Sequence, residues 1–202
     1  VKELRERTGA GMMDCKKALV ETNADLEAAI DLMRASGAAK AAKKAGRVAS
    51  EGLVNVTISD DNKHAAILEV NSETDFVTKG SAFIDFVEAL GALALKNKPE
   101  SVESFVRQKL DSGETVDEAR EGIIAKIGEN ISVRRVQIVS TDSGVLGAYK
   151  HGDRIAVLAV LSSEDAELAK DVAMHIAASR PECVSEDQLS SELLESEKAI
   201  FM

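Results

Sequence analysis

The amino-acid sequence predicts an α+β protein, on three observations. The chain opens with three short segments whose apolar residues have helical spacing. From Gly52 the apolar spacing changes to two residues, which is typical of strands. A pattern of paired strands followed by a helix then occurs twice, over residues 52–139 and 140–180, and this indicates two related α+β subdomains.

Residues 1–37 have the pattern of three short helices that form a small bundle. Asp14 can cap the second helix and Asn23 or Asp25 the third, and Gly37 supplies a stop. The apolar residues expected on the inner faces of the second and third helices are Cys15, Ala18, Leu19, Leu26, Ile30 and Met33.

Residues 38–51 are rich in alanine and carry the basic residues Lys40, Lys43, Lys44 and Arg47. Helix propensity is high here but no apolar face is evident, so the segment is interpreted as a solvated linker, in part helical. Attraction of the basic cluster to an acidic partner is the alternative, and the solvated linker is favoured over it.

In the first subdomain, strands at 53–58 and 64–70 flank a polar turn and predict a β-hairpin. Helices are expected over 81–95, 101–110 and 115–127, and a strand over 131–139. The side chains expected to point inward from the first of these helices are Phe83, Phe86, Val87 and Leu90.

The second subdomain shows strands at 145–150 and 154–160 and a helix at 163–179. After Pro181 a new helical pattern begins, with leucine and isoleucine spaced for a partner helix. It reaches Met202 without a capping signal, so we expect the chain to break off within this element. The apolar residues of this pattern are Leu189, Leu193 and Ile200.

Composition and charge exclude several classes of protein. The chain has 202 residues and a net charge of −10, and so lacks the positive field that binding to a nucleic-acid backbone requires. Its apolar runs, such as residues 155–161, are far shorter than the roughly 20 residues of a membrane span. Two cysteines, Cys15 and Cys183, fit a reducing cytoplasmic setting. Because the chain starts at Val1 rather than Met, we expect that a few residues precede it.

No motif for covalent chemistry, a cofactor or a metal stands out. Gly9 and Gly11 resemble part of a dinucleotide fingerprint, but a charged helix rather than a strand precedes them, so a turn between helices is favoured. The three histidines are scattered and neither cysteine has ligand spacing. His175 is interpreted as a packed structural residue, and His151 as a solvated turn residue that could also touch a partner.

Two segments are candidate contact surfaces. Met12 and Met13 either pack inward, which composition favours, or form an adaptable binding surface. The loop at 74–77 combines a carboxylate with an aromatic ring after an apolar strand, as a loop that inserts into a partner would. In the alternative, Thr74 or Asp75 caps a short turn while Phe76 packs on the core, and the residues alone slightly favour this.

Several segments together closely resemble the family of bacterial elongation factor Ts. They lie in order along essentially the whole chain. The segments are KELRERTGAGMMDCKKAL at 2–19, TDFV at 74–77, KIGENI at 126–131 with Arg134 and Arg135, HG at 151–152 and AMHIAA at 173–178.

The resemblance implies a division of the chain. Residues 1–37 would be a three-helix module like the ubiquitin-associated domain, 38–51 a linker, 52–139 an N-subdomain and 140–180 an incomplete C-subdomain. Residues 181–202 would begin a helical hairpin used for dimerisation.

The resemblance also implies guanine-nucleotide exchange on the GTPase elongation factor Tu, without covalent chemistry and without a cofactor or metal of its own. Thr74, Asp75, Phe76 and Val77 would enter the GTPase beside its magnesium site. Ile127 and Gly128 would line the same surface, and His151 would reach another domain. Met12, Met13 and Lys16 would bind from a second side, and Phe76 would then be exposed.

The implied partners are elongation factor Tu and a second copy of the chain, in a homodimer or a 2:2 complex, with no nucleic acid or membrane. One rival is a passive binding module that acts through the N-terminal helices. The other is a small α/β enzyme, against which the absence of a phosphate-binding loop and of clustered ligands weighs.

Overall fold

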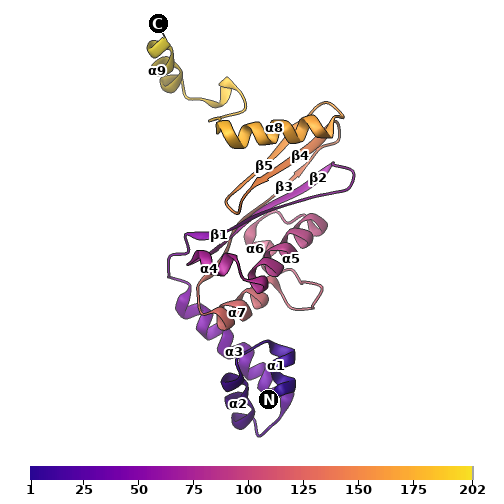
Figure 1. Cartoon of the computed structure of the whole chain (residues 1–202), viewed down its shortest axis with the longest axis vertical. Coiled ribbons are helices and arrows are strands. Elements are labelled where there is room, and N and C mark those ends of the chain that lie inside the picture. Colours follow the sequence, from indigo (N-terminus) through magenta and orange to yellow (C-terminus); the bar gives the residue numbers. More distant parts are fainter. Residues whose placement is uncertain (202) are drawn as a thin grey trace.

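The computed structural model describes residues 1–201 and confirms the α+β class. The N-terminal helices lie at one end of the molecule, two antiparallel sheets lie in the middle, and α9 (Ser191–Phe201) lies at the other end (Figure 1).

The first three helices are α1 (Lys2–Thr8), α2 (Met12–Glu21) and α3 (Leu26–Lys44). They form a small core around Leu4, Cys15, Ala18 and Ala29, against which the remaining predicted apolar residues pack, as expected. Asp25 caps α3, since its carboxylate accepts the Ala28 N–H at 3.0 Å. Asp14 does not cap α2. The N-cap is Gly11, and Asp14 lies in the first turn, where its charge is favourable to the helix dipole.

The prediction that Gly37 ends the third helix is wrong. Residues 38–44 are helical, which agrees with a linker that is in part helical, but Ala41 is buried, so the segment is not solvated throughout. Helix α3 continues to Lys44 across α7 (Val116–Ile127). Gly37 and Ala41 are buried and lie four residues apart on one face, so small side chains form the packing surface that looked absent from the sequence.

The larger sheet contains β1 (Glu51–Ile58), β2 (His64–Ser72) and β3 (Ile131–Ser140), in that order and antiparallel. The predicted hairpin and the third strand are therefore confirmed, each a little longer than expected. Helix α5 (Ser81–Asn97) packs on this sheet, and its four predicted inward residues are all buried in the main core.

The predicted helix over 101–110 is wrong beyond its first turn, α6 (Val102–Phe105). The backbone N–H of Leu110 donates to the Glu114 carbonyl and that of Val116 to the Gln108 carbonyl. These bonds close a tight loop that takes the place of further helix. Helix α7 then begins as predicted, with a reciprocal capping box between Thr115 and Glu118.

The second sheet consists of β4 (Val145–His151) and β5 (Ile155–Leu161), and α8 (Ala166–Ser179) packs against both strands. Backbone hydrogen bonds join this second sheet to the hairpin of β1 and β2 at two points. The Val54 N–H donates to the Asp153 carbonyl at 2.9 Å, and the Leu146 N–H donates to the Asn62 carbonyl at 2.8 Å. The two sheets are therefore joined directly.

The chain then forms a short 3-10 helix, η1 (Glu186–Gln188), before α9. Leu193 and Ile200 on α9 are exposed, and their pairing with a partner helix stays a prediction. The expectation for Met202 lies outside the described residues. None of the helices within residues 1–201 combines the length and the apolar character that crossing a bilayer requires.

Candidate functional site

The segment at 74–77 connects β2 to α5 and forms a single helical turn, α4 (Asp75–Thr78). Phe76 is 80% exposed, whereas Val77 next to it is only 6% exposed and packs into the main core. Neighbouring residues of a helix point about 100° apart, so burying Val77 turns Phe76 outward. The alternative in which Phe76 packs on the core is therefore wrong.

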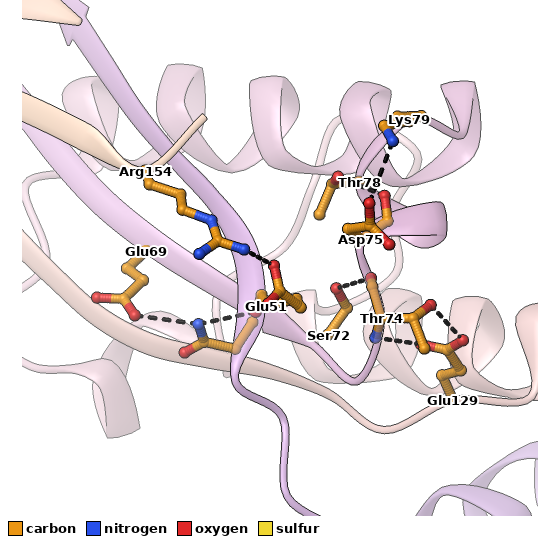
Figure 2. A network of polar contacts seen from close by, with 10 residues as sticks. Glu51, Glu69, Ser72, Thr74, Asp75, Thr78, Lys79, Glu129 and Arg154 are labelled. Carbon is orange, nitrogen blue, oxygen red and sulfur yellow. Dashed lines mark hydrogen bonds and ion pairs between the residues drawn. The ribbon is translucent and has the colours of Figure 1, made fainter. Parts of the chain in front are cut away.

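Thr74, just before α4, is held by a residue far away in the sequence. Its backbone N–H and its hydroxyl each donate to the Glu129 carboxylate, at 2.9 and 2.8 Å, as Figure 2 shows. The Ser72 hydroxyl donates to the Thr74 carbonyl at 3.1 Å, and the Thr78 hydroxyl donates to the Asp75 carbonyl at 2.8 Å. The turn is thus fixed at both of its ends.

Asp75, Phe76 and Lys79 form one small exposed surface. The Lys79 ammonium lies 3.2 Å from the Asp75 carboxylate and 5.9 Å from the centre of the Phe76 ring. A cation at that distance from a ring is attracted by its π-electrons, although weakly when exposed to water. Sequence reasoning missed Lys79; its position four residues after Asp75 on a helical turn was the available signal.

Ile127 and Gly128 lie at the end of α7 and are half-buried. Gly128 ends the helix in the left-handed region, at φ 88°, and the Lys44 ammonium donates to its carbonyl. Glu129 follows directly, so its contact with Thr74 brings the ends of α7 and β2 together. The structure thus joins two of the segments predicted to contact a partner.

Met12, Met13 and Lys16 lie on α2, and all three are exposed. The exposed fractions of the methionines are 58% and 62%, so the interpretation in which they pack inward is wrong. Helix α2 lies near the N-terminal end of the molecule and α4 lies beside the larger sheet (Figure 1). These residues therefore form a surface separate from Phe76.

His151 is the last residue of β4 and is exposed. Its ring stacks on that of Tyr149 with the ring centres 6.3 Å apart, and its Nδ1 lies 3.2 Å from the tyrosine hydroxyl. Tyr149 was not singled out from the sequence, although residues two apart on a strand share a face. His175 is exposed rather than packed, because the buried residues of α8 are the small Ala169 and Ala173.

Gly9 and Gly11 form the turn between helices that was favoured over a dinucleotide site. Gly9 ends α1 in the left-handed region at φ 64°, and Gly11 precedes α2. Within residues 1–201, no three histidine, cysteine or acidic side chains lie close enough together to hold a metal ion. Phe76, Met12, Met13 and His151 are all exposed, and their role as partner contacts stays a prediction.

Comparisons with known proteins identify the family of the chain. The sequence model of the family described as Elongation factor TS matches residues 73–202. The chain is 66% identical to Elongation factor Ts of Ruthia magnifica over all of its 202 residues, which cover 68% of that protein. It is 59% identical to Elongation factor Ts of Vesicomyosocius okutanii and 56% identical to that of Thioalkalivibrio sulfidiphilus, again over its whole length and 70% and 69% of theirs. The chain therefore belongs to the elongation factor Ts family.

Proposed function

We propose that this chain is a guanine-nucleotide exchange factor that promotes GDP release from the GTPase elongation factor Tu. The single observation that carries the proposal is the Phe76 ring, 80% exposed on a turn whose next residue is anchored in the core. Large aromatic side chains are normally buried, and an exposed ring on a braced turn is suited to enter a partner.

The physical basis of exchange is linkage between two binding events. A protein that binds the nucleotide-free GTPase more tightly than the GDP-bound form must weaken GDP binding by the same factor. No bond is made or broken in the process, so the chain acts as a binding protein and not as an enzyme. Its site of action would be the cytoplasm.

In this proposal the Phe76 surface acts at the magnesium site of the GTPase. Asp75 and Phe76 would enter beside the metal, with Thr74 and Val77 holding the turn in place. Displacing the elements that hold the metal weakens its bridge to the phosphates of the nucleotide. Ile127 and Gly128 would line the same contact.

The other exposed residues would bind the GTPase elsewhere. Met12, Met13 and Lys16, on α2 of the N-terminal three-helix bundle, would contact the nucleotide-binding domain from a second side. His151, within a C-subdomain at 140–180, would reach a different domain. Contacts at separate places would keep the complex together while Phe76 displaces the metal-binding elements.

The test is the rate at which fluorescent GDP leaves elongation factor Tu when excess unlabelled nucleotide is added. Adding the chain should raise this rate, and the equilibrium affinity for GDP should fall as the chain concentration rises. A release rate that does not depend on the chain would reject the proposal.

Passive binding through the N-terminal helices is the second candidate, because Met12 and Met13 are exposed there. It predicts that a fragment with all of α1, α2 and α3, residues 1–44, alone retains the full affinity for the partner. Homodimerisation or a 2:2 complex through the segment at 181–202 is a separate proposal, and light scattering of the chain with and without elongation factor Tu tests it.

A further inference from the structure

We infer that Glu129 is a positioning residue, which holds the Phe76 turn in the orientation that exchange requires. This inference rests on the proposed exchange function. The Glu129 carboxylate accepts two hydrogen bonds from Thr74, although the two residues are 55 positions apart in the sequence. Bonds between such distant segments fix the place of the turn relative to the body of the protein, which local bonds cannot do.

Helix α4 needs such support because it has only four residues. A single helical turn is unstable alone, since it fixes several backbone angles for very few hydrogen bonds. A threonine before a helix ordinarily caps it with its hydroxyl, but Thr74 makes no such bond. Its hydroxyl instead donates to Glu129, so the start of the turn is tied to the end of α7.

The contact is reciprocal. Glu73 lies next to Thr74, and its carboxylate accepts the backbone N–H of Asn130, next to Glu129, at 2.6 Å. Each segment thus supplies a carboxylate to a backbone N–H of the other. The Glu73 carboxylate also pairs with the Arg47 guanidinium at 2.9 Å, and the buried Asn130 side chain donates to the Arg47 carbonyl at 2.7 Å. The segment that follows α3 is joined to the same structure.

Val77 and Glu129 then have different roles in presenting Phe76. The buried Val77 side chain holds the inner face of α4, and burial alone is non-directional. Burial of Val77 turns Phe76 outward, and the two bonds to Glu129, because hydrogen bonds are directional, restrict the rotation of the turn that burial leaves free. Glu129 also follows Ile127 and Gly128 directly, which couples the two surfaces proposed to contact the same partner.

Glu129 forms no ion pair within the described part of the chain, so its hold on Thr74 consists of hydrogen bonds. This allows a conservative variant. In Glu129→Gln, the amide oxygen can still accept from the Thr74 N–H, and the amide nitrogen can donate to the hydroxyl oxygen. Glu129→Ala removes both bonds. Thr74→Val removes only the hydroxyl bond and keeps the size of the side chain.

The first measurement is stimulated GDP release from elongation factor Tu. We expect Glu129→Ala to slow it about tenfold, the size that loss of hydrogen bonds of ordinary net strength produces. Glu129→Gln should retain most of the rate, and Thr74→Val should lie between the two. An equal loss in the alanine and glutamine variants would overturn the inference, because the effect would then not come from the hydrogen bonds.

The second measurement does not depend on exchange. The chain contains no tryptophan, so Phe76→Trp introduces a single indole at the tip of the turn. Adding Glu129→Ala should lower the fluorescence anisotropy of this indole while the melting temperature and circular dichroism change little. Unchanged anisotropy would overturn the inference. If the alanine variant fails to fold, Thr74→Val decides the question by the same two readouts.

Failure of this inference can be told apart from failure of the proposed function. If Phe76→Ala slows GDP release and Glu129→Ala affects neither release nor anisotropy, the positioning role is wrong and the exchange function stands. If Phe76→Ala leaves release unchanged, the proposed use of Phe76 fails, and the anisotropy measurement still shows whether Glu129 holds the turn.

Discussion

Gly37 in α3 lies directly against Ala125 in α7. A methyl group in place of the glycine hydrogen would lie 3.7 Å from the Cβ atom of Ala125 and 3.9 Å from the Glu121 carbonyl oxygen. The two helices therefore cross closely at this point, and α3 runs without interruption from the N-terminal bundle to the main core. This crossing sets the position of the Met12 surface relative to the rest of the molecule.

We expect Gly37→Ala to stabilise the protein by about 0.5–1 kcal/mol. Alanine has the higher helix propensity by about that amount, and the added methyl group meets its neighbours at ordinary contact distance. For a chain of this size, the melting temperature should rise by roughly 2–4 °C per kcal/mol. Thermal and urea denaturation measure the effect.

Gly37→Leu is the matched variant. The longer side chain does not fit the crossing, so its helix propensity cannot compensate and the protein should lose stability. Equal stability of the leucine and alanine variants would contradict the close packing of α3 on α7.

The stability of α7 should depend on pH through Glu121. Burial raises the pKa of this carboxyl, the nearby Asp117 raises it further, and Arg120 opposes the rise. A raised pKa in the folded state means that the stability contribution is complete below about pH 4.3, the pKa of an unfolded glutamate, and is lost as the pH rises through the folded value. Glu121→Gln should therefore raise the melting temperature at pH 7, and the gain should disappear at low pH.

Glu118, in the first turn of the same helix, is a control of opposite sign. The Thr115 backbone N–H and hydroxyl donate to its carboxylate and lower its pKa. Its contribution is present at neutral pH and is lost as the pH falls. Glu118→Gln should thus lower the melting temperature at pH 7 and have little effect at low pH. Melting curves from pH 3 to 7 test both variants, and shifts of the same sign in the two would contradict this account.

Periodicity predicted most of the elements, and it failed where packing depends on small side chains or on distant bonds. Gly37 and Ala41 lie on the buried face of α3, but the spacing of large apolar residues does not reveal a face made of glycine and alanine. His175 lies between Met174 and Ile176, which favoured burial, yet α8 packs through its alanines. An antiparallel bridge between Lys109 and Thr115, across the loop around Gly113, takes the place of the helix that local propensity favours.

The candidate site was predictable in part. The residues at 74–77 were identifiable as an unusual loop, but residue types alone slightly favoured burial of Phe76. The exposed position of Phe76 depends on Val77, which fills the core position next to it. The turn is also bonded to Glu129, and local sequence patterns cannot reveal a contact between residues so far apart in the chain. The resemblance to the elongation factor Ts family implies an exposed Phe76, as the structure shows, whereas composition does not.

The most direct test of the central claim is stopped-flow release of fluorescent GDP from elongation factor Tu, stimulated by the chain with and without Phe76→Ala. Because the Phe76 ring is exposed, its removal should leave the melting temperature nearly unchanged. Met174→Ala truncates an exposed residue on α8 and is the matched control. This variant should stimulate GDP release from elongation factor Tu at the normal rate. We predict that Phe76→Ala slows stimulated release by about tenfold or more while the complex still forms, as expected for an aromatic hot spot. A release rate equal to that of the unaltered chain would contradict the account.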